Sequence, residues 1–154
     1  MEPATAELRI AYEQNYEALF KLAVLLTGRH QDAEDVVHEV FVNAGRRLSE
    51  IPNDEWRSYL RASVVNRWHN RYRHHLVERR YQTDPPPARP GFEEAAAMWE
   101  AVAHLPPRQR ACLVLRYYED LSVQETAALL GCSVGTVKSQ TSRGLDRLRQ
   151  EWDA

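Results

Sequence analysis

The stretch LSVQETAALLGCSVGTVKSQTSRGLDRLR, residues 121–149, decides the fold of the C-terminal part, because it describes two short helices joined by a tight turn. Ser122 and Glu125 fit a capping box that opens the first helix. Gly131 ends that helix, since a sharp turn needs a residue that tolerates positive φ. Ser133 can cap the second helix. The stretch therefore predicts a helix-turn-helix.

The second of these helices has two different faces. Ala127 is small where the helices cross, Val137 packs the second helix onto the first, and Leu145 and Leu148 extend the buried face. Such a helix can reach base edges and phosphates from the major groove with the polar residues of its opposite face. A solvated face of an ordinary helical hairpin is the alternative, but the agreement of caps, glycine and apolar positions favours DNA contact. The DNA-facing residues are Thr136, Lys138, Ser139, Gln140, Ser142 and Arg143.

Composition places the chain among globular proteins, with 154 residues, 44% of them hydrophobic and 27% charged. No apolar run approaches the ~20 residues of a membrane span. The N-terminus also lacks the succession of basic, apolar and small residues that a signal peptide has. We therefore expect a cytoplasmic protein without membrane insertion. Cys112 and Cys132 fall in apolar helical patterns and are expected as small buried thiols. The six histidines form no metal-binding set, so no metal or cofactor is expected.

The rest of the chain also has helical periodicity. A first helix ends at Gly28, and Asp32 can cap the next one. After a turn at residues 52–54, a third helix runs from about Glu55 to Arg80. The first helix repeats apolar residues at Tyr12, Tyr16, Leu19, Phe20, Ala23 and Leu26, and the second at Val36, Val37, Val40, Phe41, Ala44 and Leu48.

The segment QTDPPPARPG, residues 82–91, is the clearest boundary, because its four prolines exclude a helix interior. Helical patterns resume over 92–105 and, after Pro106 and Pro107, over 108–118. The sequence therefore predicts an all-α protein with two small helical domains, residues 1–81 and 92–154, joined by a Pro-rich linker at 82–91.

Charge changes sharply along the chain although the total is only -2. Residues 1–60 carry a net charge of -5, residues 61–80 of +5, residues 81–131 of -3 and residues 132–154 of +1. Such a pattern suits a protein that contacts nucleic acid and a second macromolecule with different faces.

The basic segment lies on the third helix, EWRSYLRASVVNRWHNRYRHH, where aromatic residues alternate with arginines. Arginines bind phosphates, and aromatic rings offer surfaces for unpaired bases. A single aromatic at helical spacing is more often a core residue, and Tyr59 and Leu60 are assigned to the core. Trp56 and Trp68 are assigned to DNA binding.

With these motifs, the chain resembles a bacterial RNA polymerase sigma factor of the sigma-seventy class, extracytoplasmic-function (ECF) type. GRHQDAEDVVHEVFVNA is similar to the family's region 2.2, and WRSYLRASVVNRWHNRYR to its regions 2.3 and 2.4. LPPRQRACLVLRYYEDLSVQETAALLGCSVGTVKSQTSRGLDRL resembles region 4. The resemblance covers nearly the whole chain and implies a factor that directs core polymerase to promoters and assists strand opening.

The resemblance also implies a role for each segment. The residues that would bind the clamp helices of the polymerase largest subunit are Asp35, His38, Glu39 and Phe41. The third helix would bind and melt the minus-ten element, with Asn66 near the captured base and Arg67, Arg71 and Arg73 on the backbone. The helix with Lys138, Ser139, Gln140 and Arg143 would enter the minus-thirty-five element, while the helices before it dock on the polymerase flap. An anti-sigma factor is an expected further partner.

Three positions depart from the family pattern. His38 stands where glutamine is common, Gln140 where arginine is frequent, and Tyr59 replaces a usual tryptophan. A neutral Gln140 removes one phosphate or guanine contact, so promoter preference cannot be copied from relatives.

Two other functions were weighed. A free-standing helix-turn-helix regulator would need a dimer interface or an effector pocket and would leave the basic third helix unexplained. A serine recombinase or transposase would need a catalytic set on an α/β domain, and residues 1–81 lack the alternating apolar pattern of strands. The expected function is binding and strand capture without catalysis.

Overall fold

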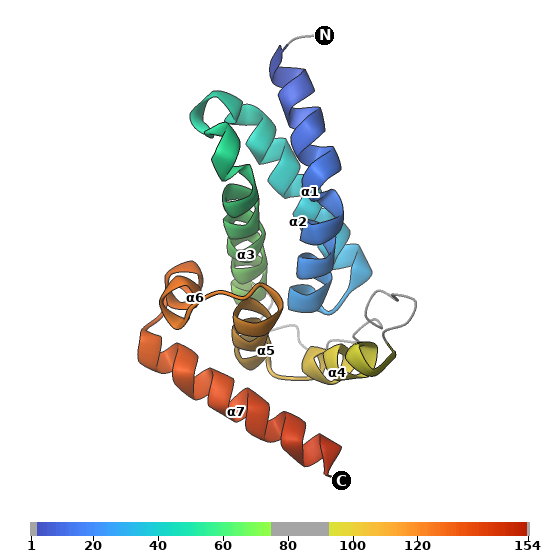
Figure 1. Cartoon of the computed structure of the whole chain (residues 1–154), viewed down its shortest axis with the longest axis vertical. Helices are drawn as coiled ribbons and strands as arrows, with labels where there is room; N and C mark the ends of the chain where they lie inside the picture. Colours follow the sequence, from blue (N-terminus) through green and yellow to red (C-terminus); the bar gives the residue numbers. More distant parts are fainter. Residues whose placement is uncertain (1–2, 75–92, 154) are drawn as a thin grey trace. The chain divides into compact units, whose positions relative to one another are not determined.

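The computed structural model describes residues 3–74 and 93–153, and the chain divides into two compact units, Met1–Arg80 and Tyr81–Ala154. Figure 1 shows α1–α3 of the first unit and α4–α7 of the second. All regular elements within these described ranges are helical, which confirms the predicted all-α class. The Pro-rich segment 82–91 lies outside the described residues, as does the expected end of the third helix.

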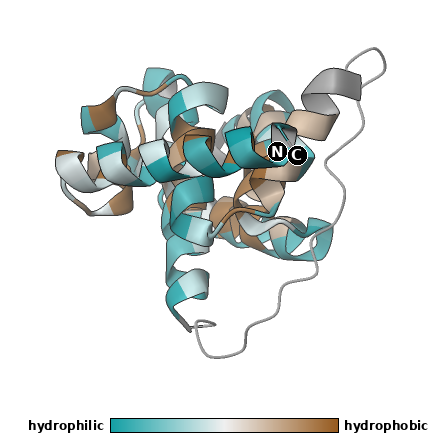
Figure 2. Ribbon diagram, turned by 90° about the horizontal axis from the view of Figure 1, so that it is seen from below, coloured by the Kyte–Doolittle hydropathy of each residue, from teal (hydrophilic) through white to brown (hydrophobic). Residues whose placement is uncertain are grey.

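The first unit packs α1 (Pro3–Thr27), α2 (His30–Arg46) and α3 (Trp56–His74) against one another. Two short 3₁₀ turns, η1 (Leu48–Glu50) and η2 (Asn53–Glu55), connect α2 to α3. Each helix contributes an apolar stripe to a shared core, and the ribbons in Figure 2 accordingly change between hydrophobic and hydrophilic along their length. The largest fully buried side chains of this core are Leu22, Leu26, Val36, Val37, Val40, Leu60, Val64 and Val65.

The turn between α1 and α2 is closed by Thr27 and Gly28. Gly28 ends α1 with φ of 76°, as predicted. The Thr27 hydroxyl donates to the carbonyl of Ala23 at 2.7 Å and accepts the N–H of Arg29 at 3.2 Å. Arg29 occupies the N-cap position of α2. The expectation that Asp32 caps this helix is wrong. Asp32 instead lies inside the first turn of α2. Its carboxylate still stabilises the helix there, because it lies near the positive end of the helix dipole.

The second unit begins with α4 (Glu93–Ala103) and α5 (Pro107–Leu113), and Pro107 occupies the first turn of α5 as expected. The helix then widens into a π-helical turn, η3 (Val114–Tyr118), in which the N–H of Glu119 bonds the carbonyl of Val114 at 3.0 Å. Asp120 follows with φ of 56°, a left-handed conformation that Asp tolerates better than most residues. The helix ends at this turn, and the helix-turn-helix follows it in the chain.

The helix-turn-helix forms as predicted from α6 (Val123–Leu130) and α7 (Val134–Trp152). Ser122 and Glu125 make both hydrogen bonds of the capping box, at 3.0 and 3.1 Å. Gly131 adopts φ of 66°, and the Ser133 hydroxyl accepts the N–H of Thr136 at 3.0 Å. Each of these bonds satisfies a backbone group that the helix end would otherwise leave unpaired.

A small cluster holds the two helices together, with Ala127 and Val137 buried beside Cys112 of α5. Cys112 is buried as expected, whereas Cys132 lies in the turn and is only partly buried. Leu145 and Leu148 are half-buried along the same helix. α7 therefore has one packed side and one exposed side.

Among the described helices, none combines the length and apolar character that crossing a membrane requires.

Candidate nucleic-acid and partner interfaces

The exposed side of α7 carries most of the residues assigned to DNA. Lys138, Ser139, Ser142 and Arg143 are exposed, while Gln140 is half-buried. These groups supply two cations, two hydroxyls and an amide, which can bind phosphates and base edges.

Thr136, which is also assigned to DNA, takes part in the N-terminal cap of α7. Its hydroxyl lies 2.9 Å from the hydroxyl of Ser133, within the helix cap. The Ser139 hydroxyl in turn donates to the Thr136 carbonyl at 3.1 Å. These two hydroxyls are therefore oriented by the helix itself before any ligand arrives.

The tryptophans of α3 lie in the core of the first unit. Trp56 is 8% exposed and Trp68 is 5% exposed. Trp68 stacks on Tyr72 with ring centroids 5.7 Å apart, and Trp56 meets Tyr59 edge-on at 6.5 Å. In this structure both indoles hold the helix in place and present little surface for a base.

Other α3 residues assigned to the minus-ten element face outward. Asn66 and Arg73 are exposed, and Arg67 and Arg71 are half-buried. Asn66 and Arg67 line a pocket of about 400 Å³ between α2 and α3. We call this the polar pocket, and its remaining lining residues are Val40, Asn43, Arg46, Arg47, Tyr59, Ser63 and Asn70.

Sequence reasoning missed most of the polar pocket. Its only signal was the repeat of Asn66 and Asn70 at i, i+4 on one face of α3. Tyr59, assigned to the core, is half-buried and lines this pocket instead. The pocket therefore combines amides, guanidinium groups and one aromatic ring, a combination that suits an unpaired base and its phosphate.

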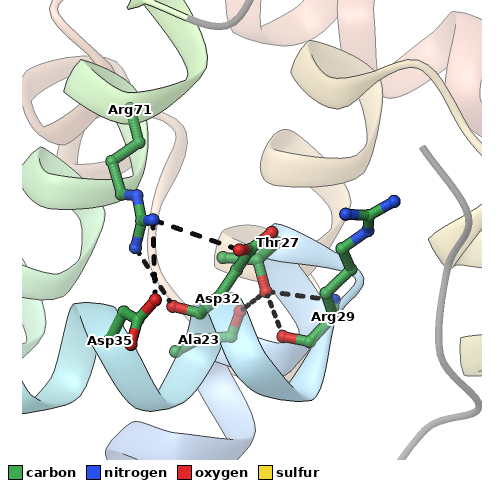
Figure 3. Close-up of polar contacts among 6 residues, drawn as sticks. All are labelled: Ala23, Thr27, Arg29, Asp32, Asp35 and Arg71. Carbon is green, nitrogen blue, oxygen red and sulfur yellow. Dashed lines mark hydrogen bonds and ion pairs between the residues drawn. The ribbon is translucent and has the colours of Figure 1, made fainter. Parts of the chain in front are cut away.

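Two α3 arginines reach back to carboxylates of α2. Arg71 Nη2 lies 3.8 Å from Asp35 Oδ2 and 4.0 Å from Asp32 Oδ1 (Figure 3). Arg71 Nη1 also donates to the Asp32 carbonyl at 3.4 Å. Arg67 Nε lies 3.7 Å from Glu39 Oε2. Residues assigned to DNA and residues assigned to polymerase are thus paired with each other.

A second pocket, of about 550 Å³, lies between α1 and α2. Of the residues assigned to polymerase, Asp35, His38 and Phe41 line it, whereas Glu39 does not belong to its lining. We call this the aromatic pocket, and its other lining residues are Leu8, Tyr12, Tyr16, Glu34, Val37 and Val42.

The aromatic pocket has a stacked wall and an acidic rim. Tyr12 packs on Tyr16 at 5.0 Å and edge-on against Phe41 at 4.9 Å between ring centroids. Burial, helped by Tyr12 and Glu34, raises the pKa of Tyr16. Tyr12 and Val42 remain 45% and 43% exposed and add apolar surface at the pocket. An apolar floor with carboxylates at its edge suits an amphipathic, basic protein segment.

Family models match both units. The model described as Sigma-70 region 2 matches residues 11–76, and the model described as Sigma-70, region 4 matches residues 95–148. The RNA polymerase sigma-E factor of Streptomyces coelicolor is 32% identical over 142 residues, which cover 88% of this chain and 80% of that protein. The chain belongs to the sigma-70 family. As an ECF sigma factor, it directs RNA polymerase to specific promoters.

Further relatives agree with this assignment. The ECF RNA polymerase sigma factor SigE of Mycolicibacterium smegmatis is 30% identical over 148 residues, 88% of this sigma factor and 58% of the relative. The solved structure of the sigma factor RpoE in complex with the anti-sigma factor NepR, from Bartonella quintana, has a TM-score of 0.74 at 22% identity. That similarity covers 95% of this sigma factor and 96% of the solved chain, and it supports the shared fold.

The alternatives weighed from the sequence are not favoured. A free-standing regulator does not account for a region 2 match beside the region 4 match. A recombinase would need an α/β catalytic domain, and the elements described for this sigma factor are helical.

Proposed function

We propose a division of labour within this sigma factor that assigns one task to each surface. The aromatic pocket binds the clamp helices of the polymerase largest subunit, the polar pocket captures the minus-ten strand, and α7 reads the minus-thirty-five element. The helices before α7 dock on the polymerase flap. Residues 1–81 and 92–154 act as two domains linked through residues 82–91.

The polar pocket is the observation that carries the minus-ten assignment. Asn66 and Asn70 can hydrogen-bond a base edge, while the Tyr59 ring lies at the same pocket and can stack on the base. Arg46 and Arg47 place cations at the rim for the neighbouring phosphates. Arg47 Nε lies 3.0 Å from the carboxylate of Glu50, an exposed ion pair that orients the guanidinium only weakly.

Strand opening then needs no chemistry from this chain. Unstacking costs a few kcal/mol per base step, and a stacked, captured base returns ~1–3 kcal/mol. Binding therefore offsets melting once the polymerase holds the promoter in place. The sigma factor acts by binding and strand capture, in the cytoplasm, where the polymerase is.

The aromatic pocket supports a polymerase contact by its composition. Exposed Tyr12 and Val42 offer apolar surface, and Asp35 and Glu34 favour a basic partner. The sigma factor RpoE, whose fold this chain shares, was solved in complex with the anti-sigma factor NepR, and CnrH, which also has this fold, in complex with the cytosolic domain of CnrY. We include an anti-sigma factor among the partners of this chain on that likeness.

Run-off transcription tests the function directly. Purified core polymerase is supplied with a genomic promoter pool, with and without this protein. New transcripts that share a two-part upstream motif are expected, and they would supply the promoter sequence. A palindromic footprint made by the protein alone, without new transcripts, would favour a free-standing regulator instead.

A further inference from the structure

The α2 helix separates two surfaces that a sigma factor uses for different partners. Val37, His38 and Phe41 line the aromatic pocket, whereas Val40 and Asn43 line the polar pocket. The two pockets therefore share one helix as a wall. Any group on α2 that contacts both surfaces can link what happens on one to what happens on the other.

Charged groups of α2 and α3 meet along the seam between these two helices. The α2 carboxylates, Asp32, Asp35 and Glu39, face the α3 arginines, Arg67 and Arg71, at 3.7 to 4.0 Å. Figure 3 shows Arg71 extended from α3 toward Asp32 and Asp35 on α2. Asp35 also lines the aromatic pocket, and Arg67 also lines the polar pocket. Each pocket thus has one lining residue in an ion pair of the seam: Asp35 pairs with Arg71, and Arg67 pairs with Glu39.

The ion pairs of the seam are weak enough to exchange partners. Their side chains are between 31% and 47% exposed, and the separations are long for ion pairs. Partly exposed pairs of this kind are individually weak and readily exchange partners. They bias the arginines toward α2 without locking them there. A DNA phosphate or a competing cation can therefore replace either partner.

We propose that the α2 carboxylates act as intramolecular substitutes for DNA phosphates in the free protein. A cationic partner segment that engages these carboxylates releases the α3 arginines for the DNA backbone. Polymerase binding and minus-ten binding are coupled through this exchange, which lowers the affinity of the free protein for DNA. The inference rests on the proposed division of labour, in which the clamp helices are that segment.

The first experiment uses the free, full-length protein and a fluorescein-labelled single-stranded oligonucleotide, with affinity measured by anisotropy at low salt. The seam variant carries Asp32→Asn, Asp35→Asn and Glu39→Gln. Removing three negative charges strengthens DNA binding in any case. The control variant therefore makes the same charge change at carboxylates of the first unit that line neither pocket, with Glu7→Gln, Asp54→Asn and Glu55→Gln.

We expect the seam variant to bind the oligonucleotide about two- to tenfold more tightly than the control variant, the combined effect of freeing two weakly held arginines. The excess should vanish when both variants also carry Arg67→Ala and Arg71→Ala. Equal affinities of seam and control variants would overturn the proposal, and so would an excess that survives loss of the arginines. Thermal unfolding of each variant establishes that it is folded.

The second experiment adds core polymerase at a concentration that saturates each variant, as established by pull-down, because Asp35 and Glu39 are themselves assigned to polymerase binding. The polymerase should increase the affinity of the control variant for the oligonucleotide more than that of the seam variant. In the seam variant Arg67 and Arg71 are already released before the polymerase binds. An equal increase in both would overturn the coupling. Failure of the proposed function would appear separately, as absence of promoter-dependent transcripts with wild-type protein, and the free-protein comparison does not depend on it.

Discussion

At the scale of single residues, the side chains of α3 serve two purposes on opposite sides of one helix. Trp56 and Trp68 are buried and hold the helix against its neighbours. Asn66 and Arg73 face outward, and Asn66 lies at a pocket large enough for a base. The helix thus presents polar groups from a position that its aromatic residues keep rigid.

Asn66→Ala should impair strand opening more than closed-complex formation. Loss of the amide removes hydrogen bonds that only a base in the polar pocket receives, which slows opening by roughly tenfold. Permanganate reactivity near the start site measures opening, and a mobility shift measures the closed complex. Gln31→Ala, an exposed amide at the start of α2, serves as control. Wild-type permanganate reactivity in the Asn66 variant would contradict the assignment.

Lys138→Ala combined with Arg143→Ala should weaken minus-thirty-five binding and leave polymerase binding intact. Both cations lie on the exposed side of α7, and each base or phosphate contact contributes ~1–3 kcal/mol. Promoter affinity of the holoenzyme measures the first effect and a core pull-down the second. Arg147→Ala removes another exposed cation of α7 and should have a smaller effect. Loss of core binding in the double variant would speak against a DNA role.

Cys112 should resist alkylation in the native protein. Its burial, reinforced by Cys132, raises the pKa of the thiol from 9.0 to about 11, and the thiolate is the reactive form. Iodoacetamide at pH 8 should label Cys112 only after denaturation, as mass spectrometry of a Cys132→Ser variant can show. Because the unfolded thiol ionises first, stability should fall as pH rises from 9.0 toward 11. Complete labelling of the folded variant would refute this.

At the scale of elements, α5 and α7 approach each other closely at Gly144. A Cβ atom there would lie 3.1 Å from Leu113 Cδ1 and 3.5 Å from Gln109 Cβ. Gly135, in the first turn of α7, has room, since its nearest neighbour would be the Ser133 hydroxyl at 3.8 Å. The same residue type therefore has a packing role at one position of the helix and none at the other.

Gly144→Val should destabilise the second unit by about 1–3 kcal/mol, because the added atoms push α5 away from α7. Gly135→Ala should be neutral or stabilise by up to ~1 kcal/mol, since alanine favours the helix. Urea unfolding followed by circular dichroism compares the two. Equal stability of both variants would mean that the helices can separate without cost.

At the scale of the whole molecule, two units with net charges of 0 and -2 are joined in one chain. On the proposed division of labour, each contacts a different promoter element on the same polymerase. A second contact made by a tethered unit is intramolecular and gains from its high effective concentration. Specificity then belongs to the pair of contacts and to neither unit alone.

Residues 1–80 and 81–154, supplied as separate chains, should support run-off transcription only at about 10²–10⁴-fold higher concentration than the intact protein. Circular dichroism should show both pieces helical, which excludes misfolding as the cause. Transcription by the two pieces at the concentration that suffices for the intact chain would show that the tether is dispensable.

Local sequence patterns were enough to predict the helices and most of their ends. Ser122, Glu125, Gly131 and Ser133 act through hydrogen bonds and backbone angles within a few residues, so local order was enough to predict them. The exception, Asp32, shows the limit of such reasoning. Thr27 and Gly28 close the preceding turn and start α2 before the expected cap.

Which side chains of α3 are buried and which are available depends on how α3 packs against α1 and α2. Trp68 and Asn66 are two residues apart, yet one lies in the core and the other at a pocket. Arg71 bonds the carbonyl of Asp32 across 39 positions of sequence. Burial and ion pairing depend on which helices become neighbours in space, and helical periodicity alone does not say which face of α3 meets α1 and α2.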